Sequence, residues 1–305
     1  MNIVVVGAGA VGGYFGAKMA RVGIPVTFLV REKRYQQIKE RGLHVNSVHG
    51  DFTIEPLCVR SPKEVENPGL VILAVKNYHL EGTLGNLATF VERGAKILPL
   101  LNGVQHMDQL ISVFGRESIL GGLCYIESTL NASGDILQKS VIQDIIFGSL
   151  TEQDSMFLHE IETLFMKSGV NVKLSYEILT EMWSKYIFLV MLSGMTSATR
   201  NPIGVSQNDP VTFAFLKDLV EELITVARMM KIELPDDFSK QMITRIINTA
   251  PAMTSSMHRD LEKGLPLELD SLHGAILEMA IQQKIETPCI RAIYALLHPF
   301  LQGKN

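Results

Sequence analysis

The sequence predicts an α/β domain built on a parallel sheet, followed by an all-helical domain. Short apolar runs rich in valine, isoleucine and leucine alternate with helical spacing over residues 1–174, as expected for strands that are buried on both faces. From Tyr176 onward the strand-like runs stop and only helical spacing remains. We therefore expect two domains, residues 1–174 and 175–305, each with a core of its own.

The expected elements follow one another in a regular order. Strands are predicted at residues 3–6, 25–30, 70–75, 95–100, 119–125, 145–147 and 170–174. A small hairpin insertion is expected at residues 43–54, because His49-Gly50-Asp51 lies between two β-prone halves. Helices are predicted at residues 11–22, 33–41, 178–199, 210–230, 238–248 and 272–284.

A glycine-rich turn joins the first expected strand to the first expected helix, and its three glycines have the spacing G-x-G-x-x-G. The first glycine allows a tight turn, the second lets the backbone approach a pyrophosphate, and the third lets the helix pack on the strand. The helix N-terminus then offers unpaired N–H groups and a positive dipole end. We therefore expect a Rossmann-like, doubly wound sheet. Its expected phosphate contacts are Gly7, Ala8, Gly9, Ala10, Val11 and Gly12.

The second expected strand ends at Val30-Arg31, and this position bears on the choice of nucleotide. NAD sites usually place Asp or Glu at the tip of this strand, where it accepts from the ribose 2′-hydroxyl. A guanidinium there suits a 2′-phosphate, which it binds through paired, charge-assisted hydrogen bonds. The alternative is a solvated helix start, since Glu32 follows directly and residues 33–41 are amphipathic. The position of Arg31 favours NADP(H) over NAD(H).

Composition and charge argue against several other classes of function. The net charge is −4 and there is no basic tract, which disfavours a nucleic-acid partner. Cys58, Cys124 and Cys289 are odd in number and widely spaced, so we expect a reducing cytoplasm and neither a disulfide framework nor a zinc site. The eight histidines form no H-x-x-x-H pair, and we expect no metal. The longest later apolar run, residues 186–195, is too short to cross a membrane.

Two polar side chains follow expected strands of the first domain. Lys76 ends the third strand, and Asn102-Gly103 ends the fourth. Ligands bind beyond the carboxyl ends of parallel strands, so we expect both side chains in a cleft where cofactor and substrate meet. Lys76 could bind cofactor phosphates or a substrate carboxylate, and Asn102 could hydrogen-bond the nicotinamide ribose or the substrate. The alternative is that both are merely solvated.

The helical domain carries a lysine and a glutamate in apolar surroundings. Lys185 stands near the start of a strongly apolar helix, where it either extends to the surface or is a partly desolvated ammonium that donates its proton readily. Glu268 lies between two leucines, and a carboxylate there needs a partner or a function. Capping of the helix that follows is the simplest interpretation for Asp270 and Ser271.

Taken together, these residues resemble the ketopantoate reductases (2-dehydropantoate 2-reductases), and the similarity spans nearly the whole chain. It rests on the glycine motif at residues 7–13, Arg31, Lys76, Leu101-Asn102-Gly103-Val104, Trp183-Ser184-Lys185, Ser255-Ser256-Met257 with Asp260, and Glu268. The last three of these are the specific part, because many Rossmann enzymes share the rest.

The resemblance implies an activity: NADPH-dependent reduction of 2-dehydropantoate to (R)-pantoate, a step of pantothenate and coenzyme A biosynthesis. It implies that Lys185 is the proton donor and also binds substrate, and that Glu268 is an active-site carboxylate that also contacts the cofactor. Ser256 would bind the substrate carboxylate, and Asn102 would contact both cofactor and substrate. The helical domain would be like the C-terminal domain of 6-phosphogluconate dehydrogenase. The expected partner is a small 2-oxo acid, and a homodimer is a candidate assembly.

The chain departs from the family pattern at three positions. Leu189, Ser193 and Met253 stand where family members typically carry asparagines. A pocket that loses these amides should bind a less polar substrate, or bind 2-dehydropantoate more weakly. One alternative is therefore a reductase of another branched 2-oxo acid or of an imine. The other is a non-catalytic NADP(H) sensor, which would have no use for Lys185 and Glu268.

Overall fold

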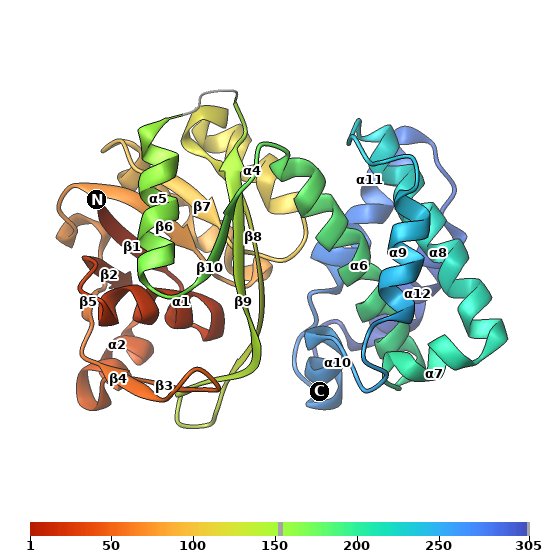
Figure 1. Cartoon of the computed structure of the whole chain (residues 1–305), viewed down its shortest axis with the longest axis horizontal. Helices are drawn as coiled ribbons and strands as arrows, with labels where there is room; N and C mark the ends of the chain where they lie inside the picture. Colours follow the sequence, from red (N-terminus) through yellow and green to blue (C-terminus); the bar gives the residue numbers. More distant parts are fainter. Residues whose placement is uncertain (152–154, 304–305) are drawn as a thin grey trace. The chain divides into compact units, whose positions relative to one another are not determined.

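The computed structural model describes residues 1–151 and 155–303, and it divides into two compact units. Unit 1 comprises Met1–Leu101 and His106–Ile178, and unit 2 comprises Asn102–Gln105 and Leu179–Asn305. Figure 1 shows that strands and helices alternate in the first unit, whereas only helices make up the second. The predicted fold class, a Rossmann-like parallel sheet plus an all-helical domain, is confirmed.

The division between the units differs in two ways from the expected boundary after residue 174. It falls after Ile178, because helix α6 (Ile178–Thr199) begins there and packs with the helical unit. The loop Asn102–Gln105, which follows a strand of unit 1, belongs to unit 2. This second difference depends on contacts between distant residues, which local sequence patterns do not report.

Unit 1 contains a Rossmann-like sheet of five strands. This sheet is fully parallel and has the strand order β5-β2-β1-β6-β7. Its strands are β1 (Asn2–Val6), β2 (Val26–Leu29), β5 (Leu57–Val59), β6 (Pro68–Leu73) and β7 (Lys96–Pro99). The central strands pair through Val5 with Phe28 on one side and with Ile72 on the other. Most side chains of these central strands are buried, which explains their continuous apolar runs. The short strand β5 was not predicted.

A second sheet in unit 1 corrects the expected strand assignment. Its strands are β3 (Leu43–Ser47), β4 (Phe52–Ile54), β8 (Leu120–Leu130), β9 (Ile136–Ser149) and β10 (Asn171–Leu174). The predicted hairpin at residues 43–54 is confirmed as the antiparallel pair β3–β4. The runs at residues 119–125 and 145–147 are parts of the long antiparallel pair β8–β9, not further strands of the parallel sheet. Much of β9 alternates between buried and exposed side chains, so its apolar signal was too weak to delimit it.

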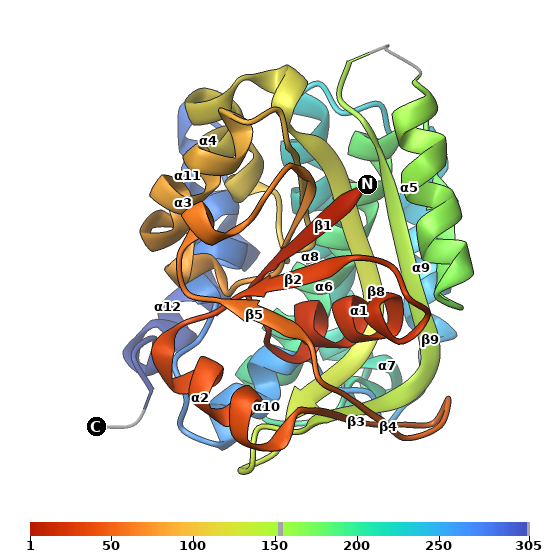
Figure 2. The same ribbon diagram turned by 90° about the vertical axis from the view of Figure 1, so that its left-hand side faces the viewer.

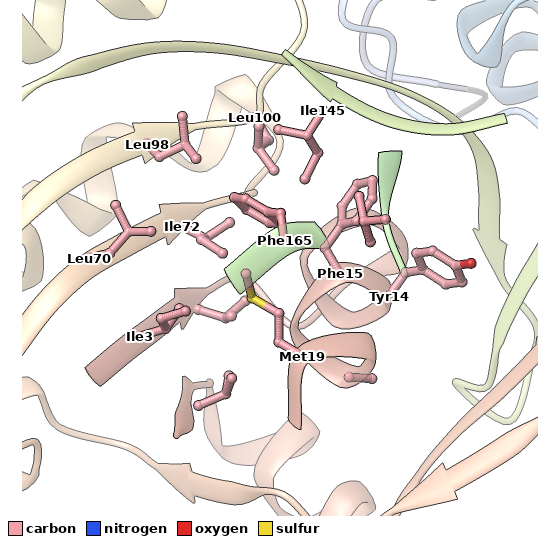
Figure 3. Close-up of a cluster of buried hydrophobic side chains, with 14 of the residues drawn as sticks. Ile3, Tyr14, Phe15, Met19, Leu70, Ile72, Leu98, Leu100, Ile145 and Phe165 are labelled. Carbon is pink, nitrogen blue, oxygen red and sulfur yellow. The ribbon is translucent and has the colours of Figure 1, made fainter. Parts of the chain in front are cut away.

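The core of unit 1 surrounds helix α1 (Ala10–Arg21), which contacts both sheets (Figure 2). Phe15 and Met19 of α1 are fully buried and lie among side chains of the parallel sheet such as Ile72 (Figure 3). Phe165 of α5 and Ile145 of β9 belong to the same cluster. The other helices of the unit are α2 (Glu32–Arg41), α3 (Leu84–Val91), α4 (Gln105–Phe114) and α5 (Met156–Lys167). This packing fixes the carboxyl end of β1, where the glycine motif lies.

Unit 2 is made of helices only among its described residues. They are α6 (Ile178–Thr199), α7 (Ile203–Asn208), α8 (Pro210–Met229), α9 (Phe238–Ile247), α10 (Ser256–Glu262), the π-helical turn η5 (Asp270–Gly274), α11 (Ala275–Gln283), α12 (Pro288–Leu297) and the short 3₁₀ helix η6 (His298–Phe300). Helix α6 has the predicted bounds, and α8 and α9 each end one residue before the predicted end. The sequence did not predict α7, α10 and α12, of which the first two are short.

A buried histidine joins η5 to α6. His273 is fully buried, and neither ring nitrogen reaches a hydrogen-bond partner in the described chain. A Cβ atom at Gly194 of α6 would lie 2.7 Å from its Nε2, so this close approach requires glycine. Burial lowers the pKa of His273 from 6.5 to about 4.

This pKa predicts an acid-sensitive unit 2. The unfolded chain takes up the proton near pH 6.5 and the folded chain only near pH 4, so stability is complete above 6.5 and falls as the pH drops through this window. The expected loss is on the order of 3 kcal/mol. Urea unfolding followed through Trp183, the only tryptophan, measures it. His273→Gln should remove most of this pH dependence, and His49→Gln, at an exposed position, should not. Equal slopes for all three chains would refute the assignment.

Candidate active site

The glycine motif forms an open loop between β1 and α1. Gly7 has φ +101°, and a Cβ there would lie 2.6 Å from the carbonyl oxygen of Ala74. A Cβ at Gly12 would clash with the carbonyl oxygen of Gly7, whereas a Cβ at Gly9 would enter open space. Gly9 is also the N-cap of α1, which has no side-chain cap and no acidic residue in its first turn. The helix N-terminus is therefore free to receive an anion, as a dinucleotide pyrophosphate requires.

Arg31 lies at the carboxyl end of β2, as predicted, and is the exposed N-cap residue of α2. Glu32, the acidic residue that follows Arg31 and left the prediction of the nucleotide open, is bonded to other residues. Glu32 forms an ion pair with Arg60 at 2.6 Å and accepts from Gln36 at 2.7 Å. This chain therefore presents a cation at the strand tip, and the acidic residue next to it in the sequence is paired with Arg60.

Two residues that lie near the glycine loop or Arg31 were missed by sequence reasoning. Arg34 donates from Nε to the carbonyl oxygen of Ala8 at 3.0 Å and from Nη1 to that of Gly134 at 2.7 Å, and it thereby fixes the loop to α2. His79 lies after β6, and partial burial and then the charge of Arg31 lower its pKa. A cation one helical turn after Arg31 was the available signal for Arg34, whereas nothing local indicated His79.

Lys76 does not end its strand. Strand β6 stops at Leu73, and Lys76 is the half-buried N-cap residue of the short 3₁₀ helix η2 (Asn77–His79). Its carbonyl oxygen accepts from the backbone N–H of His79 at 2.8 Å. Lys76 is thus in the loop that follows the carboxyl end of a central strand, which is the expected region of the sheet.

The main contact between predicted site residues is in unit 2. Lys185 of α6 donates from Nζ to Oδ1 of Asn102 at 3.2 Å, although the two residues are 83 positions apart. Both side chains are half-buried. The amide oxygen therefore orients an ammonium that remains accessible, which is the arrangement that a proton donor needs.

Glu268 is 7% exposed and lies directly before η5. Its carbonyl oxygen accepts from the backbone N–H of Leu272 at 3.1 Å and from Oγ of Ser271 at 3.2 Å. The predicted capping role of Asp270 and Ser271 is wrong, because the Asp270 carboxylate accepts from the hydroxyl of Tyr294 at 2.8 Å instead. The helical segment starts through a π-helical turn, a feature that occurs often at functional sites.

The two serines of the Ser255-Ser256 pair have separate roles. Ser255 caps α10, where its Oγ accepts from the N–H of His258 at 3.0 Å. The same Oγ lies 3.3 Å from Oγ1 of Thr196, and Nδ1 of His258 lies 2.7 Å from the carbonyl oxygen of Thr196. These contacts attach α10 to α6, the helix that carries Lys185. Ser256, the first residue of α10, is half-buried.

The three departures from the family pattern offer little hydrogen bonding to a ligand. Leu189 has an apolar side chain and is half-buried. Ser193 is fully buried and its hydroxyl donates to the carbonyl oxygen of Val190 at 3.3 Å, within its own helix. Met253 is 41% exposed; its carbonyl oxygen accepts from the N–H of Ile203 at 3.0 Å, and its own N–H donates to the carbonyl oxygen of Ala250 at 2.8 Å.

The described residues contain no group of three or more His, Cys, Asp or Glu side chains placed to hold a metal ion. None of the helices in residues 1–151 and 155–303 is long and apolar enough to cross a membrane.

An open pyrophosphate loop on a parallel sheet, together with an amide-held lysine in a helical unit, is the arrangement of a dinucleotide-dependent oxidoreductase. Comparison with known families shows which family of oxidoreductases the chain matches. Residues 3–152 match the family described as ketopantoate reductase PanE/ApbA, and residues 177–301 match the C-terminal part of the same family. The chain belongs to the ketopantoate reductase family.

Individual relatives and solved structures resemble the chain over nearly its whole length. The chain is 32% identical to the uncharacterized oxidoreductase YkpB of Bacillus subtilis over 98% of this chain and 99% of the relative. The 2-dehydropantoate 2-reductase structure from Geobacter metallireducens has a TM-score of 0.87 and 27% identity, covering 98% of this chain and 99% of that one. A D-mandelate dehydrogenase solved with NADH and anilino(oxo)acetate shares the fold, with a TM-score of 0.86, 24% identity and coverage of 98% of each chain.

Proposed function

We propose that this protein is an NADPH-dependent 2-oxo-acid reductase whose first candidate reaction is the reduction of 2-dehydropantoate to (R)-pantoate. The observation that carries the proposal is the hydrogen bond from Lys185 Nζ to Asn102 Oδ1 at 3.2 Å. This hydrogen bond orients the Lys185 ammonium. The family match supports the same proposal, because the ketopantoate reductase models match both parts of the chain. A protein that only senses the nucleotide would not need this arrangement.

The proposed chemistry assigns a task to each group. NADPH, when bound, would supply the hydride that reduces the carbonyl carbon of the 2-oxo acid. The ammonium of Lys185 stabilises the negative charge that develops on the carbonyl oxygen, donates a proton to it, and is reprotonated from water. Asn102 keeps the ammonium oriented, and Glu268 holds either the lysine or the new hydroxyl. Ser256 binds the substrate carboxylate.

NADPH is favoured over NADH by the charges around Arg31. The guanidinium is at the strand tip, and the adjacent Glu32 is paired with Arg60. A 2′-phosphate would therefore meet a cation whose acidic sequence neighbour is paired elsewhere, whereas a ribose 2′-hydroxyl would meet an arginine in place of the usual Asp or Glu. Gly7, Gly9 and Lys76 would hold the phosphates of the same cofactor.

The substrate side supports a second candidate, a reductase of branched 2-oxo acids that lack a distal hydroxyl. Leu189 contributes a hydrocarbon side chain, and the buried Ser193 hydroxyl is bonded to Val190 within α6. Substrate groups that hydrogen-bond would gain little from these side chains, so an apolar branched chain would bind as well as a hydroxylated one.

This pocket chemistry predicts weak discrimination between substrates. We expect kcat/KM for 2-dehydropantoate and for 2-oxoisovalerate to differ by less than about 100-fold, because sites that pair a substrate hydroxyl reach roughly 10⁴ or more. Restoring an amide with Leu189→Asn should raise the preference for 2-dehydropantoate. The matched substitution Leu296→Asn, at an exposed position of α12, should leave the ratio unchanged. A wild-type ratio above roughly 10⁴ would mean that other groups bind the hydroxyl.

The test of the proposed function is NADPH and NADH oxidation with a panel of 2-oxo acids, including 2-dehydropantoate, 2-oxoisovalerate and an aromatic 2-oxo acid, together with cyclic imines. We expect turnover with NADPH and at least one branched 2-oxo acid. Turnover with cyclic imines alone would show that the substrates are imines and not 2-oxo acids. Tight NADPH binding without turnover of any compound would instead favour a sensor.

A further inference from the structure

A tyrosine beside Lys185 is bonded to the π-helical turn that follows Glu268. Tyr186 is 1% exposed, and its hydroxyl donates to the carbonyl oxygen of Leu272 at 2.5 Å. A π turn displaces backbone carbonyl groups from the α-helical pattern, so they need other donors. Burial raises the pKa of Tyr186 far above its usual value, so the hydroxyl keeps its proton and remains a donor.

The ring of Tyr186 also contacts the loop that carries Asn102. A Cβ atom at Gly103 would lie 3.7 Å from Cε2 of Tyr186 and 3.1 Å from the carbonyl oxygen of Ser271. Gly103 has φ +84°, a conformation that favours glycine. The loop therefore passes close to both the tyrosine ring and the η5 backbone at Gly103.

A second contact holds the same loop to the same helical segment. Gln105 donates from Nε2 to Oε2 of Glu278, on α11, at 3.0 Å. Helix α11 continues directly from η5, so the loop is attached to this segment at two points. Sequence reasoning missed Tyr186, although a tyrosine in an apolar helix was a usable signal, since a buried hydroxyl needs an acceptor.

Three segments of unit 2 thus meet at one side chain: α6 with Lys185, the loop with Asn102, and the turn that follows Glu268. We propose that Tyr186 is a positioning residue, which sets the geometry of Lys185, Asn102 and Glu268 through its hydrogen bond to Leu272 and its ring contact with the loop. The proposal rests on the proposed function. Tyr186 itself touches neither substrate nor cofactor in this account.

The test compares two substitutions, each of which removes one tyrosine hydroxyl that is hydrogen-bonded to the turn η5. Tyr186→Phe keeps the ring and removes the bond to Leu272. Tyr294→Phe is the matched control, because its hydroxyl donates to Asp270 of the same turn at 2.8 Å but to a side-chain acceptor outside the proposed site. For each chain we would measure kcat, substrate KM, the NADPH dissociation constant by fluorescence, and hydrogen–deuterium exchange of residues 268–275.

We expect Tyr186→Phe to lower kcat by about 10- to 100-fold, as small misplacements of reacting groups do, while KM and NADPH affinity change less than about threefold. Exchange should accelerate in residues 268–275 and in the Asn102–Gln105 loop. Tyr294→Phe should keep kcat within about threefold of wild type. Gly103→Ala, which disturbs the same contact from the loop side, should reproduce the selective loss of kcat.

Other outcomes overturn the proposal. A Tyr186→Phe chain with wild-type kcat would show that the bond does not position the site. Parallel loss of kcat and NADPH affinity, with faster exchange throughout unit 2, would show a general role in stability. A wild-type chain that reduces none of the panel would defeat the proposed function separately. The exchange data would then still decide whether Tyr186 holds the turn.

Discussion

Lys185→Ala should lower kcat by a factor on the order of 10² to 10⁴ and leave NADPH affinity nearly intact. The lysine is the group that we propose to neutralise the developing oxyanion and to donate the proton, and both effects occur only in the transition state. NADPH affinity should persist because the glycine loop and Arg31 belong to unit 1, whereas Lys185 belongs to unit 2. Stopped-flow reduction and fluorescence titration measure the two quantities separately.

Lys240→Ala is the control for the charge deletion, because Lys240 is an exposed lysine on α9 of the same unit. Its turnover should match that of the wild type. Near-normal turnover of Lys185→Ala would remove this lysine from the chemistry. Equal losses in kcat and NADPH affinity would instead point to a disturbed fold, which circular dichroism would detect.

Arg31→Ala should weaken NADPH binding by about 1–3 kcal/mol, the range of a lost charge-assisted contact, which corresponds to roughly 5- to 150-fold in the dissociation constant. NADH binding should barely change, because NADH has no 2′-phosphate. The argument depends on the exposed position of Arg31 and on the ion pair that occupies Glu32.

The matched control is Lys33→Ala, which removes a neighbouring exposed cation of the same helix. It should affect the two nucleotides equally and weakly, through long-range charge alone. A wild-type chain that binds NADH as tightly as NADPH, or an Arg31→Ala chain that loses both alike, would contradict the assignment of Arg31 to the 2′-phosphate.

Local patterns sufficed for the parts of the fold whose signal is local. The glycine turn, strand β1 and helix α6 were predicted closely, because each has a local signal: a glycine spacing, a continuous apolar run and a long, strongly apolar helical stretch. The pair β8–β9 was not, because its long strands alternate between two environments and pair across the chain. The π turn η5 was missed, and the partner of its Leu272 carbonyl oxygen is Tyr186, 86 positions away, which no local pattern reports.

The candidate site shows the same division. Arg31 and the glycines could be located from their place after a strand, and the structure puts them there. The contact between Lys185 and Asn102 could not be predicted from the sequence, because no local pattern indicates a hydrogen bond between residues 83 positions apart. The roles of Glu268 and Ser256 come from the family resemblance and stay predictions. The capping role expected for Asp270 was wrong because its carboxylate is engaged by Tyr294 of α12.

Transfer of deuterium to a 2-oxo acid from NADPH that carries deuterium at both hydrogen positions of nicotinamide C4 tests the central claim most directly. We would incubate the protein with 2-dehydropantoate, and in parallel with 2-oxoisovalerate, and analyse the products by mass spectrometry. The account predicts one deuterium at C2 of the hydroxy acid for each NADPH consumed, and a strongly reduced rate with Lys185→Ala. NADPH consumption without label in the product, or no transfer to either acid, would contradict it.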